Sequence, residues 1–211
     1  MSDFSKQYLS FLKNEFSGLN LTSFNTEKEI QNKLYEDSIY PPKVSKVFFE
    51  MINMQGLIVD IGFGGGFPIL PLAQMFPEKN FVGIESKNKK LLAVKFIASK
   101  MDIKNITLIH SRYENIVFDI PTLITFKAVG DIEELLKNLK TTSCVRVFFY
   151  KGQKDKNYNF NKISKWREIE YLETVDANNE TRVLIGVENK NVPCGTFLKN
   201  NKNLVNLSDF I

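Results

Sequence analysis

The residues of this chain with the clearest chemical potential lie in one stretch, 60–72, with the sequence DIGFGGGFPILPL. Four glycines fall within five residues, directly after the apolar run LIV at 57–59. Glycine lets the backbone take left-handed conformations and lets another group approach the main chain closely. The cluster therefore predicts either a tight turn or a ligand that lies against the backbone.

The spacing of these glycines excludes two classes of phosphate-binding loop. A P-loop needs a Lys followed by Ser or Thr after the last glycine, and no such pair follows here. A dinucleotide-binding turn, G-x-G-x-x-G, would need its third glycine at position 67 or 69. Those positions hold Phe67 and Ile69, so a nicotinamide oxidoreductase is disfavoured.

The pattern that remains, Gly62-x-Gly64-x-Gly66 after Asp60, resembles the first motif of the class I S-adenosylmethionine (AdoMet) methyltransferases. AdoMet has no pyrophosphate, so such a loop passes close under the amino-acid part of the cofactor. Asp60 would accept a hydrogen bond from the ammonium group or position a water there. A second acid is expected at the end of the next strand, facing the ribose hydroxyls, and Glu85 stands there. The segment 111–116, SRYENI, follows the third strand and would face the adenine.

The elements that position these residues alternate between strand and helix. Strands are predicted at 57–61, 80–86, 106–110, 122–129, 145–150, 167–175 and 181–188, and helices at 68–76, 87–102 and 131–140. Helices at 4–16, 26–37 and 42–53 precede them, with Thr26 and Glu29 as a capping box and a break at Pro41 and Pro42. This order predicts an α/β, Rossmann-like fold of the class I methyltransferase type. We expect a mostly parallel seven-stranded sheet with an antiparallel last strand.

The length of 211 residues favours one structural domain. We predict a helical N-terminal extension (1–54), an AdoMet-binding core (55–190) and a polar C-terminal tail (191–211). The chain has two cysteines, Cys144 and Cys194, and one histidine, His110, which argues against a disulfide framework, a metal site or a histidine triad. Neither a membrane span nor a signal peptide is expected, so we predict a cytoplasmic protein. The net charge of +4 permits a nucleic-acid partner without requiring one.

The segment after the fourth strand narrows the choice of methyl acceptor. The sequence TFKAVGD at 125–131 lacks the [N/D]-P-P-[Y/F/W] motif of enzymes that methylate exocyclic amines. Neither cysteine lies where a cytosine C5 methyltransferase needs its nucleophile. Guanine N7 has a free lone pair and needs no base, which agrees with the absence of an evident one. Protein and small-molecule acceptors stay open on these grounds.

Six segments in fixed order resemble the RsmG family, also called glucose-inhibited division protein B. They are LNLTS (19–23), EDSI (36–39), VDIGFGGGFPILPLA (59–73), SRYEN (111–115), FKAV (126–129) and FFYKGQ (148–153). The resemblance implies an AdoMet-dependent transfer of methyl to N7 of a guanine in 16S rRNA. It also implies the 16S rRNA or the small ribosomal subunit as partner, without a membrane or a metal, and we expect a monomer.

The resemblance also carries site residues over to this chain. Gly62, Phe67, Tyr113 and Glu114 would contact AdoMet, and the motif argument adds Asp60, Gly64 and Glu85. Arg112 would lie near the cofactor carboxylate or the target nucleotide and is predicted to be catalytic. Lys127 stands where the family typically has Arg, and it is assigned both to catalysis and to the cofactor. Lysine keeps the charge and loses the two-pronged guanidinium.

Three questions stay open from sequence alone. Phe63, Phe67 and Tyr113 could stack on a target base or pack the loop. Two lysine clusters (Lys87, Lys89 and Lys90; Lys151, Lys154 and Lys156) could bind an RNA backbone or be solvated surface. The N-terminal helices could cover the cofactor or bind RNA. Two other functions are also kept: a non-catalytic ribosome-assembly module on a methyltransferase fold, and a methyltransferase with a different substrate.

Overall fold

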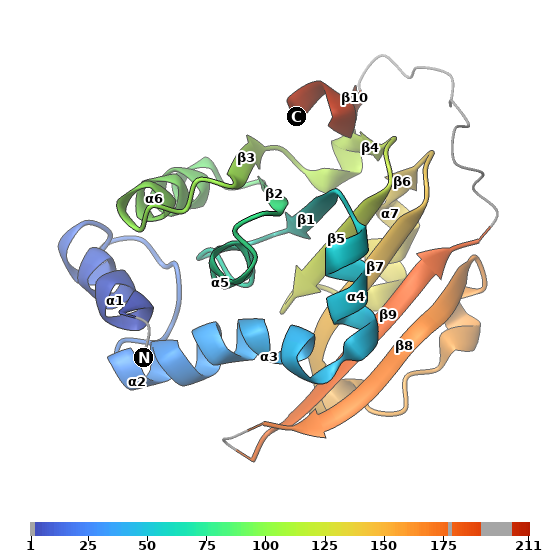
Figure 1. Ribbon diagram of the computed structural model, residues 1–211, viewed down its shortest axis with the longest axis horizontal. Coiled ribbons are helices and arrows are strands. Elements are labelled where there is room, and N and C mark those ends of the chain that lie inside the picture. The colour runs from blue at the N-terminus through green and yellow to red at the C-terminus, as the bar shows by residue number, and fades with distance from the viewer. Residues whose placement is uncertain (1–2, 177–178, 191–203) are drawn as a thin grey trace.

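The computed structural model describes residues 3–176, 179–190 and 204–211. Its centre is a seven-stranded sheet of order β3-β2-β1-β5-β7-β9-β8 (Figure 1). The strands are β1 (Leu57–Ile61), β2 (Asn80–Glu85), β3 (Ile106–His110), β5 (Thr122–Lys127), β7 (Val145–Gly152), β8 (Trp166–Val175) and β9 (Thr181–Asn189). The first five are parallel to one another, and β9 runs antiparallel to both β7 and β8. The predicted α/β class, the Rossmann-like sheet and the antiparallel last strand are confirmed.

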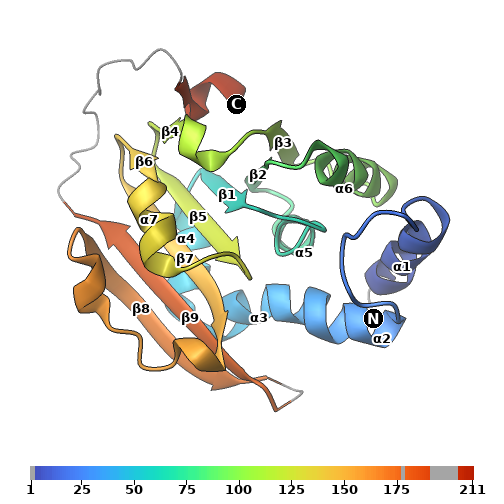
Figure 2. The same ribbon diagram turned by 180° about the vertical axis from the view of Figure 1, so that it is seen from behind.

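The sheet has an apolar core on each face because its strands are buried on both sides. Side chains alternate along each strand, so Ile58 and Phe148 face one core while Val59 and Phe149 face the other. The first core is covered by α1 (Phe4–Asn14), α4 (Lys46–Met54), α5 (Ile69–Met75) and α6 (Asn88–Lys100). The second lies under α7 (Ile132–Asn138), seen from behind in Figure 2. These helices match the predicted ones within a few residues.

The N-terminal helices differ from the prediction at the proline pair. α2 (Glu27–Glu29), a π-helix (Ile30–Glu36) and α3 (Asp37–Val44) form one continuous rod that includes Pro41 and Pro42 (Figure 1). The predicted break at these prolines is wrong, since α3 continues through both of them and ends at Val44. Proline removes a helical donor, and the Ser38 carbonyl four residues before Pro42 accepts instead from the Tyr150 hydroxyl at 3.3 Å. Ser45 then caps α4 through the Phe48 amide.

A second, three-stranded sheet was not predicted. It consists of β4 (Ile116–Phe118), β6 (Lys140–Thr141) and β10 (Val205–Asn206) in the order β10-β4-β6. The segment 204–211 therefore packs on the protein, with the Leu207 side chain fully buried. Short 3₁₀-helices complete the structure at Tyr113–Asn115, Gln153–Asp155, Phe160–Ile163 and Leu207–Phe210. The prediction for Cys194 and part of the predicted turn at 176–180 lie outside the described residues. Within them, no helix has the length and apolar content to cross a membrane.

Candidate functional site

Asp60 lies near the carboxyl end of the central strand β1, with β2 on one side and β5 on the other. Its side chain is buried, and its Oδ1 accepts from the Thr125 hydroxyl at 2.9 Å. Its Oδ2 is buried without a hydrogen-bond partner. Burial, with a smaller contribution from the charge of Glu85, raises the pKa of Asp60 from 3.8 to about 7. The Thr125 hydrogen bond, the nearby Ile69 backbone amide and the charge of Lys127 act in the opposite direction. A buried carboxylate oxygen without a donor fits the amino group of AdoMet, so the residues present suit this cofactor.

The glycine loop that follows β1 is tied to the end of β2. Gly62 takes a positive φ of 72°, and its amide donates to the Ile84 carbonyl at 2.8 Å. The Gly64 amide donates to Glu85 Oε2 at 3.1 Å, while Glu85 Oε1 accepts from the Lys87 amide at 2.8 Å. Glu85 thus links the loop after β1 to the loop after β2. The two predicted acids, Asp60 and Glu85, both lie at the carboxyl edge of the sheet.

The other glycines of this loop are required by packing underneath it. A Cβ on Gly65 would lie 2.7 Å from the Leu21 carbonyl oxygen, and one on Gly66 would lie 2.5 Å from Leu70 Cδ1. Gly62 and Gly64 have more room, since their nearest neighbours would be Val129 Cγ1 at 3.3 Å and the Gly62 carbonyl oxygen at 3.9 Å. The loop therefore has one face packed against the core and one face that a ligand can approach.

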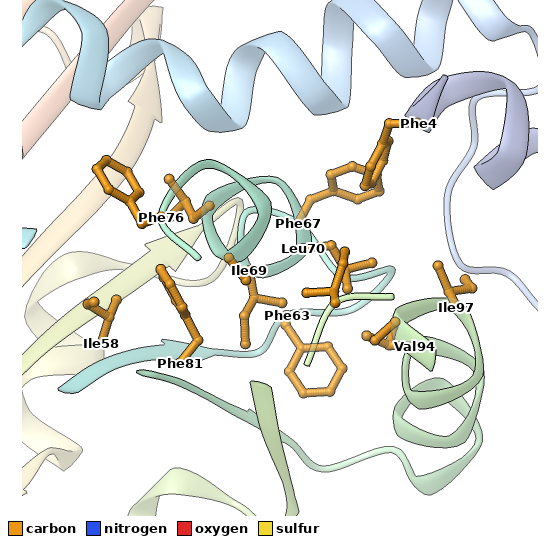
Figure 3. Packing of buried hydrophobic residues seen from close by; sticks show 14 of the residues in the cluster. Phe4, Ile58, Phe63, Phe67, Ile69, Leu70, Phe76, Phe81, Val94 and Ile97 are labelled. Carbon is orange, nitrogen blue, oxygen red and sulfur yellow. The ribbon is translucent and has the colours of Figure 1, made fainter. Parts of the chain in front are cut away.

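The two phenylalanines of the loop, Phe63 and Phe67, lie within the buried hydrophobic cluster (Figure 3). Phe63 is 2% exposed, and its ring lies where a side chain on Gly83 would be. Phe67 is 8% exposed and packs edge-on against Phe4 and Tyr8 from α1. Both rings pack the loop, so the alternative of stacking on a target base is excluded for them in this conformation. A contact between Phe67 and a cofactor would involve its backbone.

The segment after β3 lies beside Glu85. The Ser111 amide donates to the Glu85 carbonyl at 3.2 Å, and a 3₁₀-helix begins at Tyr113. The Tyr113 hydroxyl donates to the Leu135 carbonyl at 3.3 Å, its ring lies edge-on to Phe126, and burial raises its pKa to about 12. Arg112 is exposed, and Glu114 is half-buried. All the predicted cofactor residues except Lys127 therefore lie in or beside the loops that follow β1, β2 and β3.

Lys127, the last residue of β5, belongs to a different cluster. Its ammonium forms an ion pair with Asp37 of α3 at 2.9 Å, and only 11% of its side chain is exposed. Asp37 also pairs with Arg182 of β9 at 2.7 Å. Arg182 contacts Asp176 at 2.9 Å and Glu180 at 2.8 Å as well. One carboxylate of the N-terminal extension therefore joins two strands of the sheet.

A cavity of about 460 Å³ lies over this cluster. Both acidic and basic side chains line it. The acidic ones are Asp37 and Asp155, and the basic ones are Lys127, Lys151, Lys154 and Arg182. Burial lowers the pKa of Lys151, whose ammonium donates to the Gly130 carbonyl at 2.8 Å. Val129 lines the cavity and lies close to the glycine loop, since a Cβ on Gly62 would be 3.3 Å from Val129 Cγ1.

The two lysine clusters predicted near this edge behave differently. Lys151 and Lys154 line the cavity, whereas Lys156 forms an ion pair with Glu173 at 2.6 Å. Lys87 and Lys89 are exposed at the start of α6, and Lys90 is half-buried near Gly64. No group of three or more His, Cys, Asp or Glu side chains with metal-binding geometry occurs among the described residues.

Sequence reasoning missed Asp37, Thr125, Tyr150 and Arg182 as parts of this edge. Tyr150 is buried, and burial together with the charges of Asp60 and Asp37 raises the pKa of its hydroxyl. A local signal existed for Asp37, in the EDSI segment, and for Tyr150, in FFYKGQ. Arg182 had no local signal, since it reaches the site through the pairing of β9 with β7, where it lies opposite Gly152.

Comparison with known proteins identifies the family. The family model for GidB, described as rRNA small subunit methyltransferase G, matches residues 3–183. This chain belongs to that family. A methyltransferase G from Petrotoga mobilis is 32% identical over 193 residues, which cover 83% of this chain and 84% of that protein. One from Brachyspira hyodysenteriae is 30% identical and covers 84% and 87% of the two chains. The match to a Lactococcus lactis member is 31% identical and spans half of that protein's length.

Solved structures agree on the fold of this methyltransferase G family member. M. jannaschii TYW2 in complex with AdoMet gives a TM-score of 0.51 at 14% identity, over 72% of this chain and 75% of that one. P. horikoshii TYW2 with MeSAdo gives 0.50 at 14% identity, over 74% and 62%. The resemblance to the RsmG family is thus confirmed, and the chain is an AdoMet-dependent methyltransferase.

Proposed function

We propose that this protein transfers the methyl group of AdoMet to N7 of a guanine in 16S rRNA of the small ribosomal subunit. The observation that carries the proposal is the closeness of two sites at Val129. Val129 lines a cavity with cationic groups, and it lies near Gly62 in the loop that follows Asp60, whose carboxylate has a buried oxygen without a hydrogen-bond partner. Family membership supports the same reaction class.

The cofactor is assigned to the loops after β1, β2 and β3. Asp60 Oδ2 would accept from the amino group, and the backbone at Gly62 and Gly64 would lie under the amino-acid part. Glu85 would accept from the ribose hydroxyls and Tyr113 and Glu114 would flank the adenine. AdoMet supplies a methyl group on a positively charged sulfur, so the protein's task is to hold the acceptor in line with that bond.

The acceptor nucleotide is assigned to the cavity over Lys127 and Arg182. Lys127, Lys151 and Arg182 can donate to phosphate and base oxygens. Guanine N7 carries a free lone pair, so neither Asp37 nor Asp155, the acids that line the cavity, is needed as a base. The methyl transfer moves one positive charge from sulfur to the guanine ring, so the net charge in the site is unchanged. Catalysis then rests on positioning, in which Arg112 and Lys127 would orient the nucleotide or the cofactor carboxylate.

The chemistry of N7 also restricts the RNA structure that can be a substrate. N7 lies in the major groove, which is deep and narrow in double-stranded RNA, so a protein site cannot reach it there. We infer that the target guanine lies in a loop or another unpaired element and enters the cavity at the carboxyl edge of the sheet. We propose that the protein acts in the cytoplasm as a monomer. The division of the chain into an N-terminal extension, a core and a C-terminal tail at residues 54 and 190 stays a prediction.

The test uses small subunits and 16S rRNA from cells that lack this gene. Purified protein and AdoMet labelled in the methyl group are added, and the RNA is digested to nucleosides. We expect the label in 7-methylguanosine, at a single 16S position mapped by borohydride and aniline cleavage. Label in another nucleoside would overturn the N7 assignment, and RNA binding without methyl incorporation would favour the non-catalytic module.

A further inference from the structure

The N-terminal helix α1 is hydrogen-bonded to the glycine loop through one side chain. The Tyr8 hydroxyl donates to the Gly65 carbonyl at 2.7 Å, and the bond is buried. Tyr8 has no exposed surface, and burial raises its pKa, so the phenol keeps its proton and acts as a donor. A buried carbonyl that loses its donor costs more than an exposed one, because no water replaces it.

The same helix fills the space beneath the loop. Phe67 follows the glycines and packs edge-on against Phe4, with ring centroids 5.9 Å apart (Figure 3). It also packs edge-on against Tyr8, with ring centroids 5.0 Å apart. The Leu21 carbonyl packs directly against Gly65, so any side chain at Gly65 would collide with it. The loop is thus held from below by residues 4–21, and from the β2 side by the bond between the Gly64 amide and Glu85.

The two restraints act on neighbouring residues. Gly64 donates to the acid assigned to the ribose, and Gly65, the next residue, accepts from Tyr8. The Gly65 carbonyl shares its peptide plane with the Gly66 amide, which donates to the Phe63 carbonyl at 2.7 Å. Rotation of this peptide would therefore break that bond and disturb the turn that contains Gly64, which faces the cofactor side. α1 itself is anchored elsewhere, by Phe11 against Phe96 of α6 and by the Ser5 hydroxyl, which donates to Gln31 at 2.6 Å.

We propose that Tyr8 is a positioning residue for the cofactor loop, and that occupancy of the cofactor site is thermodynamically coupled to the docking of α1. The inference rests on the proposed cofactor site. Coupling of this kind is reciprocal: if a docked α1 raises cofactor affinity, a bound cofactor must stabilise the docked α1 by the same factor. On this proposal the N-terminal extension supports the cofactor loop from below. The sequence alone left open whether these helices cover the cofactor or bind RNA.

The test compares two variants that each remove one hydroxyl from the same extension. Tyr8→Phe removes the donor to Gly65, whereas Tyr35→Phe removes an exposed hydroxyl that donates to Gln74 at 3.4 Å. Both rings pack near Phe4, so the pair is matched in size and place. Binding of S-adenosylhomocysteine is measured by calorimetry, and methyl transfer is measured at limiting and saturating AdoMet.

We expect Tyr8→Phe to raise the Kd for S-adenosylhomocysteine and the KM for AdoMet about tenfold, with kcat largely kept. Tyr35→Phe should change each value less than about twofold. A merely structural role would lower the fraction of binding-competent protein, and hence the stoichiometry, and leave the Kd unchanged. An unchanged Kd in Tyr8→Phe would overturn the inference. Absence of binding by the unaltered protein would instead overturn the cofactor site itself.

A second measurement needs no variant and covers the case in which Tyr8→Phe does not fold. Amide hydrogen exchange of the unaltered protein is followed with and without S-adenosylhomocysteine. The coupling predicts slower exchange in residues 5–14 when the ligand is bound, beyond any change in β8, which lies far along the sheet. Equal exchange in residues 5–14 in the two states would contradict it.

Discussion

The carboxyl edge of the sheet has two halves, one proposed for the cofactor and one for the methyl acceptor, and they are stabilised by different kinds of interaction. The half proposed for the cofactor, after β1 and β2, is held through main-chain groups of the glycine loop. The Gly62 amide donates to a carbonyl, the Gly64 amide donates to the Glu85 side chain, and the Gly65 carbonyl accepts from Tyr8. Packing under Gly66 leaves little room for a side chain. The acceptor half, after β5 and β7, is held by side chains, in which Asp37 joins Lys127 to Arg182. The first half contains a motif that can be recognised in one stretch of sequence, whereas the second is formed by side chains from three distant segments.

This difference predicts how each half responds to change. A side chain added to the tightly packed glycine loop should destabilise it, because the surrounding atoms leave little space for the added atoms. An ion-pair cluster fails when a charge is removed, because the partner is left partly buried without compensation. Changes in one half should therefore separate cofactor binding from methyl transfer.

The largest effect is expected for Gly66→Ala. The residue has a φ of +92°, and the new Cβ would lie 2.5 Å from Leu70 Cδ1. Strain and overpacking together should lower the free energy of unfolding by about 3 kcal/mol or more and abolish cofactor binding. Urea denaturation and calorimetry measure both. Gly56→Ala is the control, since nothing lies within 4 Å of its added Cβ, and an equal loss there would mean that the loop is not specially constrained.

Asp37→Asn should weaken the acceptor half alone. Lys127 would lose its ion-pair partner while only 11% of its side chain is exposed, whereas Arg182 keeps Asp176 and Glu180. We expect a loss of about 2 kcal/mol in stability and about a tenfold fall in methyl transfer, with S-adenosylhomocysteine affinity unchanged. The matched change is Asp102→Asn, which removes an exposed pair with Lys104 and should cost less than about 0.5 kcal/mol. A parallel fall in cofactor affinity would show that the halves are not separable.

Asp60 gives the cofactor half a pH dependence. Its pKa is raised from 3.8 to about 7 by burial, so the folded protein holds this proton more tightly than the unfolded chain. The stability it contributes is therefore complete below pH 3.8 and is lost as the pH rises through about 7, at roughly 1 kcal/mol per pH unit. The ionised form suits the ligand's amino group, so affinity for S-adenosylhomocysteine should rise over the same window.

The matching experiment measures urea stability and ligand affinity at several pH values between 5 and 8 for the protein and for Asp60→Asn. The variant cannot ionise, so both slopes should flatten. A slope that persists in Asp60→Asn would assign the dependence to another group.

The smallest effect is expected for Lys127→Arg. A guanidinium at the end of β5 would keep the ion pair with Asp37 and could add a second contact. Transfer rates should stay within about threefold of the original, with the KM for RNA as the most sensitive measure. A tenfold gain would mean that lysine at this position limits the enzyme.

The same contrast explains what sequence reasoning could reach. Asp60, the glycines and Glu85 were predictable because each follows a strand in a fixed local pattern. The Asp37 cluster was not, because it depends on where α3 crosses the sheet and on the register of β9 against β7. The prolines were misjudged for a similar reason, since Tyr150 supplies the missing partner to the Ser38 carbonyl. The buried Phe63 and Phe67 could be told from base-stacking rings only once Gly83 and α1 were in place.

The strand order also has a consequence for how the chain folds as it is synthesised. β9 is the last strand of the large sheet, yet it lies between β7 and β8. Until residues 181–189 emerge, β7 has one open edge and β8 has no partner in the sheet. A chain interrupted before residue 181 would expose both edges and lack Arg182, so it would be prone to aggregation and inactive. The pairing of β9 with β7 and β8 and the placement of Arg182 in the proposed acceptor site therefore occur together, late in synthesis.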